Sequence, residues 1–390
     1  MTSQAQSRSP SGSEIPILDE AMLTRRDVVR LFALGLWRPP TVLGLGWRSH
    51  ERHDGMRQLA DHARVRWGVM MPAAHVATVL ERDVVYRAGC LDNFNLLAIP
   101  DFGWARVEPE QDTWNLGPVS GAADFATAAG MVAMGMHLLW GHPSQIPAWL
   151  RQTVESGSAR DHALRHVAAV VRAMRGRVAV WSVLNEFEGA PSFPGLDFWR
   201  SALRFGDIVD VFQRIREEDQ KATLLINDFG IEVPGGPGFM EDRRDRMLRL
   251  VTELRAHGAP LGGIGFQMHI DGGNLSDPTV RRRRLSLFRD NVHAFQDVGV
   301  HVCVTELDIS IDGLSGSVAD RLALQADLYE SVLQSTFEAG VLSVSLWGLS
   351  DRYAIGLPPG QPGRLLFDST MQPKPSYYAA DRALRALATH

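Results

Sequence analysis

The sequence predicts an α/β protein whose main part is one (β/α)8 TIM barrel. Three observations lead to this fold. From about Trp67 onward, the 390-residue chain contains eight short apolar runs separated by amphipathic stretches. The runs do not alternate apolar and polar residues, which suits parallel strands buried on both faces. Several amphipathic stretches end at a glycine, and a new apolar run begins within a few residues of it.

The eight expected strands cover residues 67–71, 95–100, 132–140, 178–185, 223–227, 263–270, 301–307 and 344–347. Helices are expected at LRHVAAVVRAM before Gly176, at MLRLVTELRAH before Gly258 and at LFRDNVHAFQDV before Gly299. The competing fold is a doubly wound open sheet, which usually carries a glycine-rich phosphate loop after its first strand. This chain reads MPAAH at that point, which disfavours the open sheet.

The first sixty residues are organised differently. Residues 1–20 are rich in Ser, Gln and Pro and have no hydrophobic period, which predicts disorder. Arg25 and Arg26 precede the apolar stretch LFALGLW, a pattern that resembles a twin-arginine export signal, although an arginine and two prolines interrupt the apolar region. The alternative is an amphipathic helix that packs on the domain or frays. We expect a leader at 1–60 and the barrel at 61–390, exported to an extracellular or periplasmic location, or cytoplasmic if the leader is not functional.

Composition excludes several classes of protein. The chain has 40 basic and 45 acidic side chains and a net charge of -5, which disfavours nucleic acid as the main partner. Its one dense basic run, residues 281–284, is expected to be a solvated helix face. Cys90 and Cys303 cannot form a disulfide framework and are expected to be small buried hydrophobes. No apolar run approaches the roughly 20 residues that span a bilayer.

Polar residues follow three expected strands, at the ends where a TIM barrel places its chemistry. They are Asn185 and Glu186 after strand four, Gln267 and His269 in strand six, and Thr305, Glu306 and Asp308 after strand seven. A single glutamate at a strand end is more often a salt-bridge partner or a cap. Two glutamates on one rim, however, are what glycoside hydrolysis requires, because one carboxyl protonates the leaving oxygen while the other attacks or activates water.

Two strings around these glutamates resemble a known family. WSVLNEFEG is similar to the acid/base signature of glycoside hydrolase family 10, the retaining endo-β-1,4-xylanases, and VCVTELDIS to its nucleophile signature. The resemblance continues, in the family's order, through HLLWGHPSQIPAWL, LLINDFGIE, GIGFQMHI, SLWGLSD and LLFDSTMQPKPSYYAA. It covers most of residues 65–390. It implies a single catalytic domain that hydrolyses a β-linked polysaccharide or oligosaccharide, and we expect a monomer without a cofactor or a catalytic metal.

The resemblance assigns Glu186 as the general acid/base and Glu306 as the nucleophile. It implies a double displacement with net retention, with the two carboxyls about 5 to 5.5 Å apart. The negative charge of Glu306 would raise the pKa of Glu186 until glycosylation removes that charge.

The same resemblance assigns the residues around the two carboxyls. Those matching substrate ligands are Asn185, for the 2-hydroxyl at subsite -1, His137, Gln145, Gln267, His269 and Trp347, the last as an aromatic platform. His269 also matches the histidine that hydrogen-bonds the nucleophile, with Asp308 and Gln267 completing its surroundings. His142 is placed in the layer behind the ligands. His137 and His142 could instead be satisfied interior histidines, and Trp140, one position early for the pattern, could belong to the core rather than to the site.

The chain departs from the family mainly where the glycone sugar binds. After strand two, the family's ENxMKW-like string is replaced by AIPDFGWARVEPE, in which Trp104 and Glu108 align but the Glu, Asn and Lys are missing. Asp101 could supply one replacement hydrogen bond. Ile355 replaces a tryptophan expected after SLWGLSD, and Phe229 replaces a tyrosine. Losing charge-assisted contacts worth about 1.5 to 3 kcal/mol each would weaken binding of a xylobiosyl unit.

The leading hypothesis is an endo-1,4-β-xylanase that hydrolyses xylan. One alternative keeps the barrel and its chemistry but makes the enzyme exo-acting or specific for another β-linked glycan. Another is a retaining hydrolase of a different family with the same pair of glutamates, which the C-terminal LLFDSTMQPKPSYYAA disfavours. The alternative from another class is a non-hydrolytic carbohydrate-binding protein, which would have no need for a paired acid and nucleophile.

Overall fold

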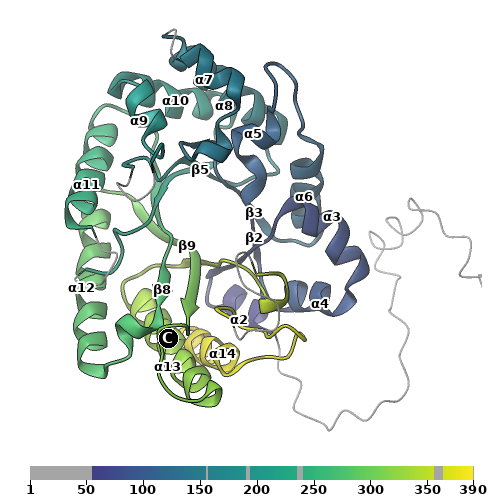
Figure 1. Ribbon diagram of the computed structural model, residues 1–390, viewed down its shortest axis with the longest axis vertical. Helices are drawn as coiled ribbons and strands as arrows, with labels where there is room; N and C mark the ends of the chain where they lie inside the picture. Colours follow the sequence, from purple (N-terminus) through teal and green to yellow (C-terminus); the bar gives the residue numbers. More distant parts are fainter. Residues whose placement is uncertain (1–54, 155–156, 190–193, 235–239, 355–362, 390) are drawn as a thin grey trace, which may run out of the picture. The chain divides into compact units, whose positions relative to one another are not determined.

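The computed structural model describes residues 55–154, 157–189, 194–234, 240–354 and 363–389, which form a closed barrel of parallel strands surrounded by helices (Figure 1). The strands are β1 Arg66–Met70, β2 Leu96–Ile99, β3 Val132–Gly135, β4 Leu139–Trp140, β5 Val180–Asn185, β6 Thr223–Asp228, β7 Gly263–Phe266, β8 His269–Asp271, β9 His301–Ser310 and β10 Ser343–Leu346. Eight of them run in the order β10-β1-β2-β3-β5-β6-β7-β9, and pairing of β9 with β10 closes the barrel. The predicted TIM barrel is confirmed.

All eight predicted apolar runs contain barrel strands, but two runs are split. The run 132–140 becomes β3 and β4, and the run 263–270 becomes β7 and β8. The short strands β4 and β8 pair with β5 and β9 beyond the ends of β3 and β7. The breaks fall where polar residues leave the ladder and turn into a cavity at the carboxyl ends of the strands.

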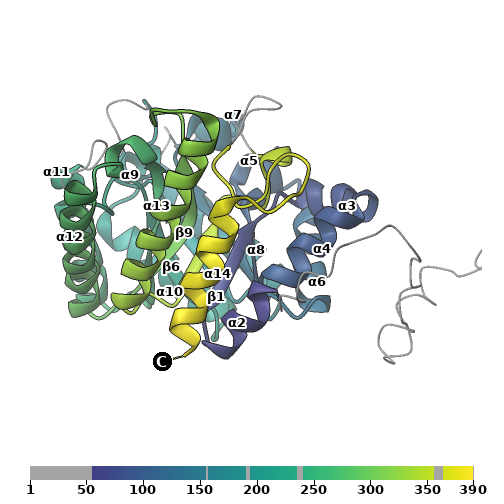
Figure 2. The same ribbon diagram turned by 90° about the horizontal axis from the view of Figure 1, so that it is seen from below.

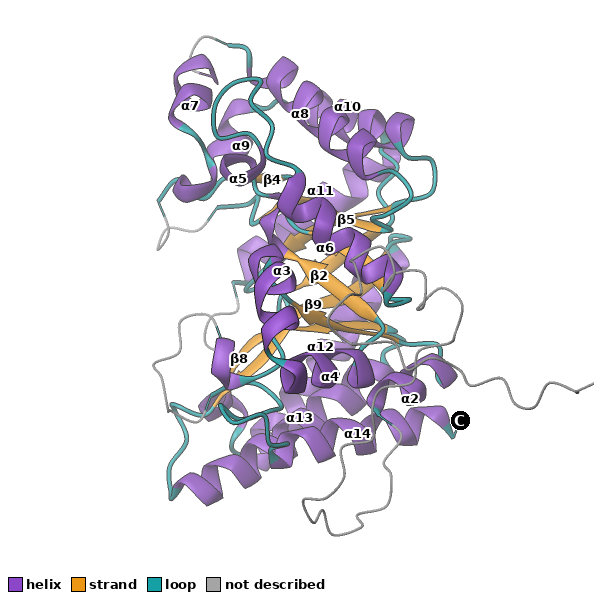
Figure 3. Ribbon diagram, turned by 90° about the vertical axis from the view of Figure 1, so that its right-hand side faces the viewer, coloured by secondary structure: helices purple, strands orange, loops and turns teal. Residues whose placement is uncertain are grey.

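Helices enclose the barrel on its outer face (Figures 2 and 3). They are α2 Met56–His62, α3 Ala73–Arg82, α4 Val84–Asn93, α5 Trp104–Val107, α6 Gly117–Ala128, α7 Ala148–Val154, α8 Ala159–Met174, α9 Phe198–Ala202, α10 Phe205–Glu218, α11 Glu241–Ala256, α12 Pro278–Asp297, α13 Val318–Glu338 and α14 Pro375–Ala388. No helix in these described ranges is long and apolar enough to cross a membrane.

The three helices predicted to stop before glycines are confirmed as α8, α11 and α12. Gly176, Gly258 and Gly299 follow them with φ angles of 75°, 79° and 83°. This left-handed conformation costs glycine little because it has no Cβ, so the chain can turn sharply into the next strand.

The apolar core has two parts, as a filled barrel requires. The barrel interior is packed by Met70, Leu96, Ala98, Met134, Met136 and Leu225. The larger part lies between strands and helices and includes the fully buried Trp67, Trp181 and Phe266. Cys90 is buried there as predicted, whereas the prediction for Cys303 was wrong: it is only partly buried, against the barrel interior.

The first element of the described chain is helix α2. Met56 and Ala60 are buried, and the helix packs against α4 and α14. Residues 56–60, expected in the leader, therefore pack with the barrel. Residues 1–54, and with them the disordered stretch and the twin-arginine pattern, lie outside the described residues.

Candidate active site

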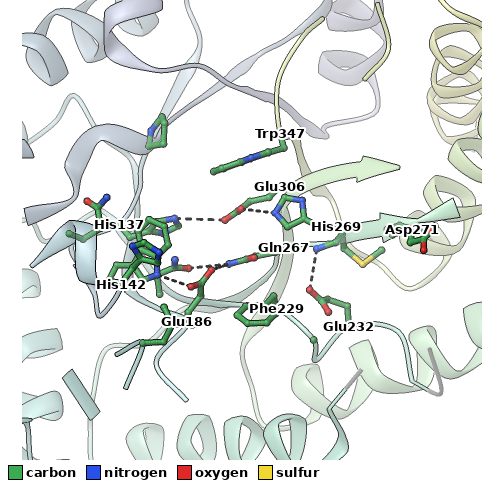
Figure 4. Close-up of a pocket in the computed structure, with 18 of the residues that line it drawn as sticks. His137, His142, Glu186, Phe229, Glu232, Gln267, His269, Asp271, Glu306 and Trp347 are labelled. Carbon is green, nitrogen blue, oxygen red and sulfur yellow. Dashed lines mark hydrogen bonds and ion pairs between the residues drawn. The ribbon is translucent and has the colours of Figure 1, made fainter. Parts of the chain in front are cut away.

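A cavity of about 820 Å³ opens at the carboxyl ends of the barrel strands (Figure 4). Most of the sequence-predicted site residues line it: His137, His142, Gln145, Asn185, Glu186, Gln267, His269, Glu306 and Trp347. They come from the loops and strand ends of β3 to β10, far apart in the chain. Asp308 does not line the cavity but contacts His269 from behind.

Glu186 follows β5 and is half-buried. Its Oε2 accepts a hydrogen bond from Trp140 Nε1 at 2.7 Å, and its Oε1 accepts one from Gln267 Nε2 at 3.1 Å. Burial raises the pKa of Glu186 above its ordinary value of 4.5, against the effect of these two hydrogen bonds, and the charge of Glu306 raises it further. A carboxyl in this setting is suited to carry a proton.

Glu306 lies on β9 and only 3% of it is exposed. Asn227 Nδ2 donates to its Oε1 at 2.8 Å, and His269 Nε2 contacts its Oε2 at 3.1 Å. His137 Nε2 lies 3.8 Å from Oε1. Hydrogen-bond partners on both oxygens fix the orientation of the carboxylate.

The two histidines beside Glu306 carry different charges. Removal from bulk water lowers the pKa of His269, but its contacts with Asp308 and Glu306 outweigh this and raise the pKa to about 10, so it is an imidazolium at neutral pH. Its Nδ1 lies 3.3 Å from Asp308 Oδ1. Burial lowers the pKa of His137 to about 4 despite the charge of Glu306, so His137 is neutral, with Nδ1 2.8 Å from Ser182 Oγ.

Asn185, Asn227 and Gln267 link the two glutamates, because Gln267 Nε2, which donates to Glu186, also donates to Asn185 Oδ1 at 3.4 Å. Asn227 Nδ2 donates to Asn185 Oδ1 at 2.9 Å as well as to Glu306, and Thr305 Oγ1 donates to Asn227 Oδ1 at 2.6 Å. The Asn185 amide oxygen is thus occupied, which leaves its NH2 group for a ligand. Asn227 was not selected in the sequence, although it is the last residue of a predicted strand, the position that identified Asn185.

Trp140 belongs to the site, so the suggestion that it is a core residue was wrong. The break between β3 and β4 turns its indole toward Glu186, and its ring lies 5.1 Å from that of His142. His142, expected behind the ligands, lines the cavity itself, and its Nδ1 contacts Ser144 Oγ at 2.8 Å.

Trp347 and Gln145 both line the cavity. Trp347 follows β10 and its ring meets His269 edge to face, with ring centres 5.7 Å apart. Gln145 packs closely on Gly103, where a Cβ atom would lie 1.9 Å from its Oε1. Only glycine can therefore occupy position 103 while Gln145 keeps this conformation.

The part of the chain around Asp101 and Glu108 differs from the expectation drawn from the family resemblance. Glu108 and Trp104 are buried away from the cavity: Glu108 pairs with Arg165 at 2.5 Å, and Trp104 stacks on His166 with ring centres 3.8 Å apart. Asp101 does line the cavity, but its Oδ2 already accepts the Ala73 backbone N–H at 2.6 Å. Ile355 lies outside the described residues.

The cavity lining also includes Phe229, Glu232 and Arg284. Phe229 packs under the guanidinium of Arg243, 4.3 Å from the ring centre. Arg284 corrects the prediction for the run 281–284, because it is half-buried and lines the cavity while Arg282 and Arg283 are exposed. Glu232 was missed in the sequence. Among the described residues, no group of three or more His, Cys, Asp or Glu side chains is arranged to hold a metal ion.

Comparison with known proteins agrees with this arrangement. The sequence profile of glycosyl hydrolase family 10 matches residues 56–383. The endo-1,4-beta-xylanase B of Thermotoga neapolitana is 30% identical over 280 residues, which cover 71% of this chain and 76% of that protein. Xylanase 10B from Thermotoga petrophila RKU-1, solved in complex with xylobiose, superposes with a TM-score of 0.74 at 28% identity, covering 87% of this chain and 100% of that one. Native xylanase 10B from Thermotoga maritima gives 0.73 at 27% identity, covering 86% and 99%.

Proposed function

Because the chain belongs to glycosyl hydrolase family 10, we propose that it is an endo-1,4-β-xylanase that cleaves xylan with retention of anomeric configuration. The relatives with that name support the substrate. The observation that carries the proposal is the contrast between two glutamates in one cavity: Glu186 has a raised pKa, and Glu306 is held by hydrogen-bond donors on both oxygens.

In the first step, a carboxylate oxygen of Glu306 attacks the anomeric carbon. The glycosidic C–O bond breaks while Glu186 gives its proton to the leaving sugar oxygen, so that a covalent glycosyl-enzyme and a free sugar hydroxyl result. The neutral His137 and the cationic His269 have different roles in this step. His137 can bind a sugar hydroxyl, whereas His269 holds Glu306 in position for the attack.

In the second step, Glu186 acts as a base. It takes a proton from a water molecule, the water oxygen bonds to the anomeric carbon, and Glu306 leaves as a carboxylate. Esterification removes the charge of Glu306, and with it one cause of the raised pKa of Glu186. Glu186 therefore gives up its proton more readily in the intermediate than in the free enzyme, as a reversal of roles requires.

The remaining cavity residues bind and orient the sugar at subsite -1. The NH2 group of Asn185, which has no partner among the described residues, would donate to the 2-hydroxyl, a contact that strengthens as positive charge develops on the ring. Trp347 offers an aromatic face to the sugar, and His137 and Gln145 offer polar atoms to its hydroxyls.

The proposal is tested with polymeric xylan beside aryl β-xyloside, β-xylobioside and β-cellobioside substrates. We expect release of xylo-oligosaccharides from xylan, and proton NMR of the first product should show the β anomer. Inactivity on all four substrates would refute the hydrolase, and initial formation of the α anomer would refute retention.

The preferred glycone is a separate question, because Asp101 already accepts the Ala73 N–H and the string AIPDFGWARVEPE after strand two lacks the family's Glu, Asn and Lys. An exo-acting enzyme or one specific for another β-linked glycan is the alternative here. A kcat/KM for the aryl β-xyloside equal to that for the aryl β-xylobioside would favour exo action or a weak subsite -2, and a preference for the cellobioside would favour β-glucans.

The non-hydrolytic alternative is tested by covalent labelling. A 2-fluoro-xylobioside with a good leaving group should accumulate as an ester on Glu306, detectable by mass spectrometry of the digested protein. Measurable sugar binding without labelling would favour a carbohydrate-binding protein.

We also propose that residues preceding the barrel act as a leader for export and that the barrel is monomeric. The paired arginines before an apolar stretch support the first statement. Lysine substitution of Arg25 and Arg26 should abolish export in the native host, and light scattering after gel filtration should give the mass of one chain. Unchanged export or a dimer mass would refute the respective statement.

A further inference from the structure

A third glutamate that lines the cavity, Glu232, is buried and takes no part in the proposed reaction. Glu232 lies in the loop between β6 and α11, and only 8% of it is exposed. Figure 4 shows it on the cavity wall beside Gln267 and His269. A carboxyl removed from bulk water to this extent needs hydrogen-bond partners in the protein.

The partners of Glu232 are backbone amides. Its Oε1 accepts from Met268 N at 3.2 Å. Burial raises the pKa of this carboxyl, and backbone N–H groups, that of Met268 first, act against the rise. The loop is fixed from outside, because Asn291 Nδ2 on α12 donates to the Ile231 and Glu232 carbonyls at 2.7 and 3.0 Å. The backbone that carries the Glu232 side chain is thus held by a side chain of α12, outside the cavity.

Met268 has an unusual backbone conformation, with a φ of 64°. The left-handed region is sparsely populated by side chains of this size and persists only where the surroundings impose it. Two contacts do so here: Met268 N–H donates to Glu232, and the Met268 carbonyl accepts from Asp308 N at 3.4 Å.

The residues on either side of Met268 reach the two catalytic carboxyls. Gln267 Nε2 donates to Glu186 Oε1, and His269 Nε2 contacts Glu306 Oε2, both at 3.1 Å. We propose that Glu232 is a positioning residue that holds the Met268 peptide and, through it, orients Gln267 on Glu186 and His269 on Glu306. The inference rests on the proposed function only for the roles of these two glutamates.

A kinetic comparison separates positioning from a purely structural role. Glu232→Gln keeps an acceptor oxygen for Met268 N–H, whereas Glu232→Ala removes it. The control is Glu218→Ala, which removes a carboxyl of similar burial, 6% exposed, paired with Arg172 at the other end of the barrel. We expect Glu232→Ala to lower kcat roughly 10- to 100-fold, the size of one lost charge-assisted hydrogen bond, with KM little changed. Glu232→Gln and folded Glu218→Ala should stay within about threefold of the wild type.

Leaving groups sharpen this comparison. Gln267 bonds to the acid/base Glu186, and His269 bonds to the nucleophile Glu306. We therefore expect kcat of Glu232→Ala to fall for two substrates. One is dinitrophenyl xylobioside, whose leaving group needs no acid, and the other is phenyl xylobioside, whose leaving group needs one. Wild-type kcat in folded Glu232→Ala, or an equal loss in Glu218→Ala, would overturn the proposal.

A second measurement needs no substrate. In protein with ¹⁵N-labelled histidines, NMR titration should report a pKa of about 10 for His269, assigned through the spectrum of His269→Asn. The charged groups facing its ring are Glu306, Asp308 and Glu232. If Glu232→Ala displaces the His269 ring from its acidic partners, the pKa of His269 should move toward its ordinary value of 6.5. In Glu232→Gln, which loses the same charge but keeps an acceptor for Met268 N–H, the pKa of His269 should stay high. An unchanged pKa of His269 in Glu232→Ala would refute the positioning role of Glu232, whether or not the enzyme is active. Lack of hydrolysis of all the substrates would refute the proposed function, and it is a separate result.

Discussion

At the scale of single residues, two glutamates of the same chemistry acquire different behaviour from their neighbours. Glu186 accepts hydrogen bonds from two neutral donors, Trp140 and Gln267. Its partial burial raises its pKa. Glu306 is bonded by Asn227 and by the imidazolium of His269. A cation favours the ionised carboxyl more than a neutral donor does.

Removing the nucleophile should abolish turnover. Glu306→Ala is expected to lower kcat on aryl xylobioside by about 10⁵-fold or more, the usual cost of losing a nucleophile. Added azide should restore part of the rate and yield the glycosyl azide of inverted configuration, identified by NMR. Glu110→Ala, which changes an exposed glutamate, is the control. Loss of less than about 100-fold would assign the nucleophile elsewhere.

Removing the acid/base should give a loss that depends on the leaving group. Glu186→Ala is expected to lower kcat/KM about 10²- to 10⁴-fold for phenyl xylobioside and far less for the dinitrophenyl substrate. The pKa of Glu186 is raised, so the proton is present below that pKa and activity falls as pH rises through it. This basic limb of the pH profile should disappear in the variant. A persistent limb, or equal losses with both substrates, would contradict the assignment.

Asn227 tests the link between the two glutamates. Asn227→Ala removes the donor at 2.8 Å from Glu306 and frees the Asn185 carbonyl. We expect kcat to fall roughly 10- to 100-fold, as for a hydrogen bond to a charged group. The matched control is Asn115→Ala, whose amide donates to the Arg106 carbonyl at the surface. Equal kcat in the two variants would show that Asn227 has no influence on the nucleophile.

At the scale of elements, strand ends bring the chemistry together and helix ends stabilise the frame. The breaks between β3 and β4 and between β7 and β8 turn Trp140 and Gln267 toward Glu186 from two directions. On the outside, α13 begins with a capping box in which Ser317 Oγ accepts from Asp320 N at 3.2 Å and Asp320 accepts from Ser317 N.

Ser317→Ala should therefore lower the free energy of unfolding by about 1 kcal/mol without changing kcat. Ser331→Ala, in the interior of the same helix, is the matched control. Its hydroxyl bonds only to the Asp327 carbonyl among the described contacts, so the change should be neutral or slightly stabilising. Urea unfolding followed by circular dichroism measures both, and equal effects would contradict a capping role.

At the scale of the molecule, the last strand closes the barrel, and the last helix packs against other helices on its outside. β10 pairs with both β1 and β9. Behind it, Lys374 at the start of α14 contacts Asp351 at 2.9 Å, and both side chains are almost fully buried. Asp351 also accepts the backbone N–H groups of Gly363 and Leu365. This cluster joins the chain after β10 to α14, which packs on α13 and α2.

Lys374→Met leaves Asp351 buried without its cation and should lower the free energy of unfolding by about 3 to 5 kcal/mol. Arg382→Ala is the comparison, because it breaks a partly exposed ion pair with Glu330 and should cost no more than about 1 kcal/mol. Both are measured by denaturant unfolding. Similar decreases in the free energy of unfolding for the two variants would mean that burial of the Lys374–Asp351 pair does not increase its contribution to stability.

Much of this architecture can be predicted from the chain because it depends on local patterns. Unbroken apolar runs, helix periodicity and stop glycines such as Gly176 act over a few residues, so they indicate the strands and helices of the barrel directly. The exceptions are the breaks in runs 132–140 and 263–270, where polar side chains leave the ladder for the cavity. Nothing in the apolar pattern marks those points.

The sequence by itself determined the barrel, the family resemblance and most of the polar residues at the strand ends that line the cavity, because strand ends of a parallel barrel must meet on one rim. Only the tertiary structure decided which partners those residues have. Trp140 could be assigned to the site only when the β3–β4 break placed its indole on Glu186, and Glu108 to the interior only when Arg165 was seen beside it. Such contacts join residues 46 and 57 positions apart, and the packing of several elements, not a local pattern, brings them within hydrogen-bond distance.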